Sequence, residues 1–106
     1  MTTTVLLLGR TDAVVGEARQ RLVTPGIEVL GGTGIDDLRS ALAGSRVDHV
    51  IMGAGLDLDT RLEIIREIFQ SSDTTTVHMK DDASGPEGFQ PFIRAVLSGL
   101  ASRQLP

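Results

Sequence analysis

The chain has 106 residues, of which 41% are hydrophobic and 23% are charged, and this length is typical of one soluble globular domain. The net charge of −4 argues against a broad basic surface for nucleic acid. The absence of cysteine excludes thiolate metal sites and cysteine nucleophiles. No apolar run approaches the roughly 18 residues of a membrane span, and the first residues lack the basic start of a signal peptide. We therefore expect a cytoplasmic protein.

The first half of the chain predicts two strands, each followed by a helix. Residues 5–8 are continuously apolar, as expected for a strand covered on both faces, and Thr11 or Asp12 can cap the next helix. Residues 27–30 form the second run, and a glycine-rich turn at residues 31–34 follows. The helical spacing of apolar side chains supports one helix through Val15, Ala18 and Leu22, and a second from near Asp36 to Gly44 through Leu38 and Leu42.

The third unit carries the most apolar helix. Residues 47–52 predict a strand that stops at the turn 53–55, and residues 59–70 predict a helix. We expect its apolar stripe to comprise Leu62, Ile65 and Phe69, with Ile64 and Ile68 beside it and Arg61 on the polar side. Because this apolar surface is wider than one stripe, either the helix lies between two others, or a homodimer buries the surface from Leu62 to Phe69.

The last quarter predicts a strand at residues 74–79, a polar loop at residues 80–88 and a helix that starts near Pro91, which lacks a backbone donor. Four strand–helix units with short connections predict one three-layer α/β/α domain over residues 1–106, with a four-stranded parallel sheet. The first and third strands are the most apolar, which favours the order 2-1-3-4 with those strands in the centre. The order 3-2-1-4 is the alternative.

Ligands of open parallel sheets bind beyond the carboxyl ends of the strands. Glycine lets the backbone approach a ligand closely, and helix N-termini favour anions, so a phosphate or carboxylate could bind there with Arg10 as counter-charge. The same glycines also suit any tight turn between a strand and a helix. The candidate ligand-binding residues are Gly9, Arg10, Thr11, Asp12, Gly32, Thr33, Gly34, Gly53, Gly55, His78 and Lys80.

The run from Val29 to Gly34 resembles the glycine-rich opening of Rossmann-type dinucleotide-binding domains, although here it follows the second strand instead of the first. That resemblance implies NAD or NADP as a cofactor. In size and expected strand order the chain also resembles flavodoxin-like and receiver domains. Receivers hold a divalent cation with carboxylates after the first strand, where this chain has Arg10, a residue that can clamp an anion instead.

A polar cluster after the fourth strand, formed by His78, Lys80, Asp81, Asp82 and Ser84, offers groups for general acid–base chemistry. It lacks the spacing of a known catalytic or metal site, so we assign no catalytic residue and no metal, and whether the protein is an enzyme stays open. His49 reads as a structural histidine. Two functions remain: a small binding domain for an anionic metabolite or nucleotide, or a non-catalytic interaction or regulatory domain with a degenerate ligand site.

Overall fold

The computed structural model describes residues 2–21, 23–53, 55–80 and 86–103. Its elements are β1 (Thr3–Leu8), α1 (Asp12–Arg21), β2 (Ile27–Gly32), α2 (Ile35–Gly44), β3 (His49–Met52), α3 (Leu58–Ser71), β4 (Thr76–Met79), the 3-10 helix η1 (Pro86–Gly88) and α4 (Phe89–Arg103). The strands within these ranges form one parallel sheet in the order β2-β1-β3-β4. The predicted order 2-1-3-4 is confirmed, and the order 3-2-1-4 is wrong.

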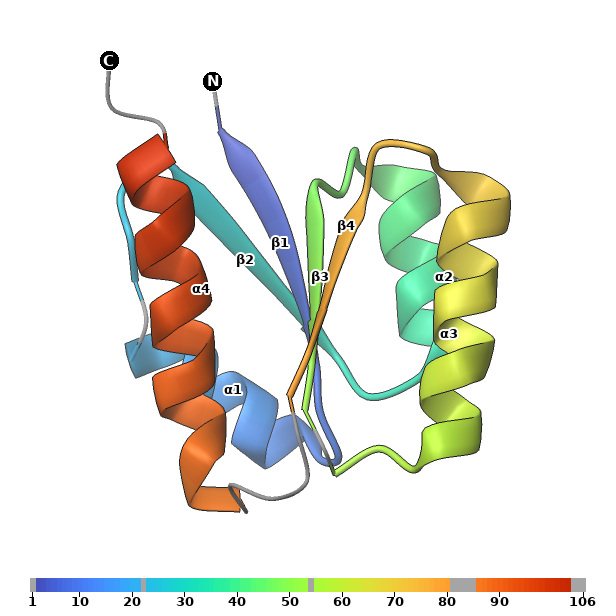
Figure 1. Cartoon of the computed structure of the whole chain (residues 1–106), viewed down its shortest axis with the longest axis horizontal. Coiled ribbons are helices and arrows are strands. Elements are labelled where there is room, and N and C mark those ends of the chain that lie inside the picture. The colour runs from blue at the N-terminus through green and yellow to red at the C-terminus, as the bar shows by residue number, and fades with distance from the viewer. Residues whose placement is uncertain (1, 22, 54, 81–85, 104–106) are drawn as a thin grey trace.

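Helices cover both faces of the sheet: α1 and α4 lie on one face, and α2 and α3 lie on the other (Figure 1). Successive side chains of a strand point to opposite faces, so β1 contributes to both hydrophobic cores. Val5 and Leu7 pack in the core beneath α1 and α4. Leu6 and Leu8 pack in the core beneath α2 and α3. All four side chains are almost completely buried, as the continuous apolar run predicts.

The glycine-rich run after the second strand begins inside the sheet. We expected Gly31 and Gly32 to form the turn, but they extend β2 and pair with Leu7 and Leu8 of β1. The physical reason is close packing against the sheet. A Cβ atom on Gly31 would lie 2.5 Å from a methyl carbon of Val15, so a larger residue would push α1 away from the strand.

Helix α3 turns a different face to the sheet from the one we predicted. Ile64 and Ile68 are completely buried and Arg61 is 8% exposed, whereas 51% of Leu62 and 63% of Phe69 are exposed. The predicted stripe and the polar position of Arg61 are therefore wrong. Helical spacing allows either stripe to face inward, and packing decides between them. The hydrogen bond from Arg39 Nε of α2 to Glu67 Oε1 of α3, 2.8 Å long, links the two helices in the observed rotation.

Helix α4 starts as the sequence predicts, two residues before Pro91, directly after η1. Phe89, Ile93 and Leu97 of α4 are buried in the core shared with α1. Leu22, Asp81, Asp82 and Ser84 lie outside the described residues. No helix within the described ranges combines the length and apolar character needed to cross a bilayer.

Candidate functional site

The candidate site is the edge of the sheet where the strands end. In Figure 1 the strands end at the same side of the molecule from which α1 and α3 start. Sheet pairing continues one residue beyond three of the strands: Gly9 N–H donates to Gly32 O, Gly53 N–H donates to Leu8 O, and Lys80 N–H donates to Met52 O, at 3.0–3.1 Å. These bonds bring Gly9, Gly53 and Lys80 into one row across the carboxyl edge.

Two of the candidate glycines serve helix packing. Gly9 and Gly53 are buried. A Cβ atom on Gly9 would lie 2.8 Å from Val15 Cγ2 of α1, and one on Gly53 would lie 2.9 Å from Phe89 Cε1 of α4. Such distances are too short for an undisturbed side chain, so the absence of Cβ lets both helices sit close to the strand ends. Helix packing therefore explains Gly9 and Gly53 better than ligand binding does.

Side-chain oxygens of the protein itself accept hydrogen bonds from backbone N–H groups near the turns. Thr11 Oγ1 accepts from Val14 N–H at 3.2 Å at the start of α1. Asp37 Oδ2 accepts from Thr33 N–H at 2.7 Å. This carboxylate lies at the end of the glycine run and would compete with an anionic ligand for the Thr33 N–H group. The adjacent Gly34 is the extended N-cap residue of α2.

Asp57 caps α3 at the same edge, where its Oδ1 accepts from Thr60 N–H at 2.7 Å. This hydrogen bond with the Thr60 backbone is the main cause that lowers the pKa of Asp57 below its ordinary value of 3.8, and the charge of Arg61 lowers the pKa further. The carboxylate therefore stabilises the folded state where it is ionised. That contribution is complete above pH 3.8 and is lost as the pH falls through the lower pKa of the folded state.

We expect Asp57→Ala to lower the melting temperature by a few degrees at pH 7, because the helix loses its N-cap. The difference from the wild type should shrink as the pH is lowered below 4, where Asp57 becomes protonated in both states. Thermal unfolding followed by circular dichroism between pH 2.5 and pH 7 measures this. Asp73→Ala, the same change at an exposed aspartate beyond the other end of α3, is the control and should show a smaller effect at pH 7.

The turns after β1 and β3 touch each other and carry an exposed cation. A Cβ atom on Gly55 would lie 2.9 Å from Arg10 Cβ, and Arg10 itself is exposed, as is Asp12 at the start of α1. Lys80, directly after β4, is 3% exposed. The structure therefore gathers Arg10, Gly55 and Lys80 at the predicted edge.

Sequence reasoning missed the burial of Arg61, which lies near the start of a helix that begins at this side of the sheet. It lies in the first turn of α3, and its Nε is buried without a hydrogen-bond partner anywhere in the described part of the chain. Buried polar groups in proteins are almost always hydrogen-bonded, so such an atom requires an explanation. A signal was present in the sequence: Arg61 precedes Ile64 by three residues and Ile68 by seven, which is the spacing of one helix face.

His78 does not lie with the turn residues. It belongs to β4, and its Nε2 is 3.0 Å from Nδ1 of His49, near the start of β3. A hydrogen bond between two imidazoles needs at least one neutral ring, because a protonated ring has no acceptor. Within the described ranges, no group of three or more metal-ligating side chains comes together. The histidine pair thus joins the two strands, as expected for His49.

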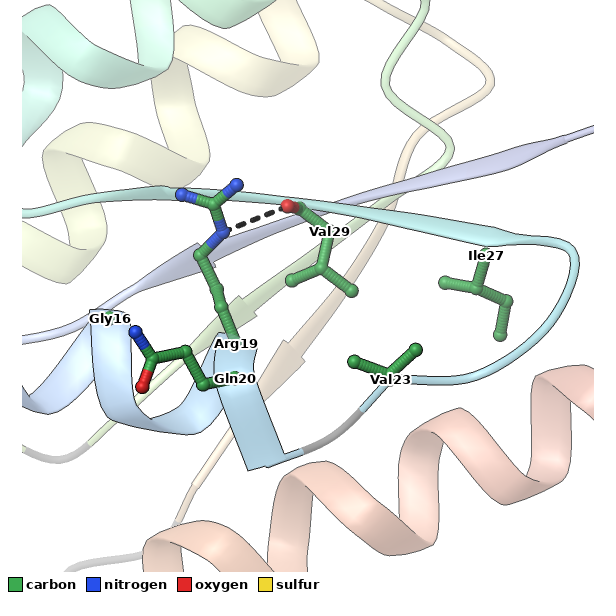
Figure 2. Close-up of a pocket in the computed structure, with 6 residues that line it drawn as sticks. All are labelled: Gly16, Arg19, Gln20, Val23, Ile27 and Val29. Atoms are coloured by element: carbon green, nitrogen blue, oxygen red, sulfur yellow. Dashed lines mark hydrogen bonds between the residues drawn. The ribbon is translucent and has the colours of Figure 1, made fainter.

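A shallow hollow of about 460 Å³ lies away from the carboxyl edge, between α1 and the edge strand β2 (Figure 2). Arg19 reaches across it, and its Nε donates to Val29 O at 2.9 Å. That bond already uses a backbone acceptor of the strand edge. The residues that line the hollow are Gly16, Arg19, Gln20, Val23, Ile27 and Val29.

Comparison of the chain with known protein families, with curated proteins and with solved structures finds no match.

Proposed function

We propose that the protein binds a small anionic ligand, such as a phosphorylated metabolite or a nucleotide, at the carboxyl edge of its sheet. The observation that carries this proposal is Arg61, which is 8% exposed and whose buried Nε lacks an acceptor among the described residues. A buried donor left without a partner costs about 1–3 kcal/mol or more when the group is charged. A phosphate or carboxylate would supply acceptors in the forked geometry that arginine prefers.

Two further cations at the carboxyl edge are consistent with an anionic ligand. Arg10 lies at the same edge on the turn that touches Gly55, and Lys80 follows the end of β4. The backbone N–H groups of Thr33 and of Thr60, which lies in the first turn of α3, already donate to carboxylates of the protein. We therefore infer that arginine side chains, and not the glycine turns, hold the anion. NAD and NADP belong to the same ligand class, but we expect smaller phosphates to bind better.

Ligand binding is tested by thermal unfolding with a panel of inorganic pyrophosphate, nucleotides, dinucleotides and sugar phosphates. A ligand at about 100 times its Kd stabilises the native state by about 2.7 kcal/mol. We expect Arg61→Gln to abolish the shift and Arg10→Ala to reduce it.

The control is Arg46→Gln, because Arg46 precedes β3 at the opposite end of the sheet and its side chain is 74% exposed. This variant should bind like the wild type. A ligand that binds Arg61→Gln with unchanged affinity, or the absence of a shift with every member of the panel, would contradict the proposal.

A second candidate function is protein–protein interaction without catalysis. The observation that favours it is the exposure of Leu58, Leu62 and Phe69 on one helix, because soluble monomers rarely expose a contiguous apolar patch of this kind. Absence of any ligand response, together with self-association in solution, would favour this function over ligand binding.

A further inference from the structure

Helix α3 carries a second apolar stripe, which we call the seam: Leu58, Leu62, Ile65 and Phe69. The exposed fractions of Leu58, Leu62 and Phe69 are 56%, 51% and 63%, and Ile65 is partly buried. Successive members of the seam are four, three and four residues apart. This spacing is that of the apolar positions with which two α-helices pack side by side.

The seam lies on the flank of α3 away from α2, where Leu58, Leu62 and Phe69 are exposed and Ile65 packs partly against the core. Glu67 lies on the flank of α3 that faces α2, where it binds Arg39, and Ile64 and Ile68 face the sheet. At 3.6 residues per turn the seam lies on the other side of the sheet-facing residues, away from α2. The exposed side chains of the seam are therefore accessible to a partner helix on that flank of α3.

We propose that α3 packs antiparallel against α3 of a second copy of this chain and so forms a twofold symmetric dimer. A twofold axis between Leu62 and Ile65 sets Leu58 of each copy against Phe69 of the other. Every apolar side chain of the seam then meets an apolar side chain. The same patch serves both copies, so the assembly closes at two subunits.

Two exposed charges beside the seam favour this antiparallel direction. Asp59 and Arg66 are exposed and seven residues apart, so they occupy the same flank of the helix. In the antiparallel pair, that flank faces its own counterpart, and Asp59 of each copy comes close to Arg66 of the other. In a parallel pair it would face the flank of Arg61 and Ile68, which is buried against the sheet. Both charges would then lack a partner.

A stable interface requires more area than the seam provides, and β4 is the element that can extend it. Such an interface buries about 800 Å² per partner, which is more than four side chains can supply. Within the described ranges β4 pairs with β3 alone and is an edge strand, and its Met79 is 38% exposed. Because α3 runs opposite to β4 (Figure 1), an antiparallel α3 pair also brings the two β4 edges together in antiparallel orientation. The interface then extends from the seam to the strand edge.

This inference rests on the second candidate function, protein–protein interaction, and is independent of the ligand site, because Arg61 lies on the sheet-facing side of α3. Sedimentation equilibrium of the full chain tests it first. We expect the wild type to be a dimer and Leu62→Glu to raise the dimer dissociation constant at least about 30-fold. Val23→Glu, at a side chain that is 82% exposed outside α3, is the matched control and should leave the constant unchanged.

Charge reversal tests the direction of the pair. Asp59→Arg and Arg66→Asp should each weaken the dimer about 10-fold, since each sets like charges against each other. The double variant Asp59→Arg/Arg66→Asp should restore wild-type affinity, and an equimolar mixture of the two single variants should form heterodimers. Circular dichroism confirms that each variant is folded.

Three outcomes would overturn this inference, and they leave different conclusions about function. A wild type that is monomeric at roughly 100 μM overturns the dimer, and the ligand panel is unaffected. A dimer that persists in Leu62→Glu is consistent with the interaction function but shows that the seam is not the dimer interface. A double variant that stays as weak as the single variants overturns the antiparallel direction.

Discussion

Leu7→Ala is expected to lower the free energy of unfolding by about 2–5 kcal/mol, the range found when a large buried aliphatic side chain is truncated. Leu7 lies in the central strand β1, is completely buried and contributes to the core beneath α1 and α4. Rigid neighbours on both sides of a central strand cannot move in to fill the space, so the cavity remains. Because small domains are stable by only about 5–15 kcal/mol, this variant should lose a large share of its stability.

Urea unfolding at pH 7 measures the loss caused by Leu7→Ala. Val23→Ala is the control, because most of the Val23 side chain is exposed and its truncation should change the stability by less than about 0.5 kcal/mol. Equal midpoints for Leu7→Ala and the wild type would contradict the burial of Leu7 in the core.

Gly53→Ala is expected to lower the free energy of unfolding by about 1–3 kcal/mol, although it adds a single methyl group. The new Cβ atom would lie 2.9 Å from Phe89 Cε1 and 3.1 Å from Phe89 Cδ1. Phe89 is the first residue of α4 and is buried in the core, so its ring can yield only if the start of α4 shifts. In a Phe89→Leu background the penalty for Gly53→Ala should become smaller, which a double-mutant cycle measures.

Gly16→Ala is the matched control for Gly53→Ala, and the expected sign is opposite. A Cβ atom on Gly16 would meet nothing within 4 Å, and Gly16 lies inside α1. Alanine there should raise the stability by roughly 0.5–1 kcal/mol, because it restricts the unfolded chain more than glycine does. Destabilisation of equal size at both positions would refute the packing explanation for the glycine at the end of β3.

The two proposals assign different roles to adjacent residues of one helix. Arg61 faces the sheet at the carboxyl edge, and Leu62 faces away from it in the seam. Both residues can therefore be substituted independently, and each assay has an internal control. Arg61→Gln should leave the dimer dissociation constant unchanged, and Leu62→Glu should leave ligand affinity unchanged.

The candidate site could be predicted from the sequence in its location but not in its chemistry. Parallel strands bring their carboxyl ends to one edge, so the turns at Arg10 and Gly55 were expected to meet there, and they do. The predicted binding of an anion by the glycine turns requires backbone N–H groups that no acceptor of the protein already uses. Asp37 accepts from Thr33 N–H, and Asp57 accepts from Thr60 N–H. The spacing of residues does not reveal which way a carboxylate points.

The sequence by itself determined the alternation of strands and helices and the order of the sheet. A strand that is buried on both faces has an unbroken apolar run, and such strands belong in the centre of the sheet. Tertiary structure alone decided the rotation of α3. That helix has two apolar stripes, and choosing between them depends on how α2 and the sheet pack against it, through contacts such as Arg39 with Glu67. This rotation buries Arg61 and exposes Leu62 and Phe69. Both proposals depend on that one choice, since periodicity ranks helix faces by apolar content and takes no account of the neighbouring elements that must fit against them.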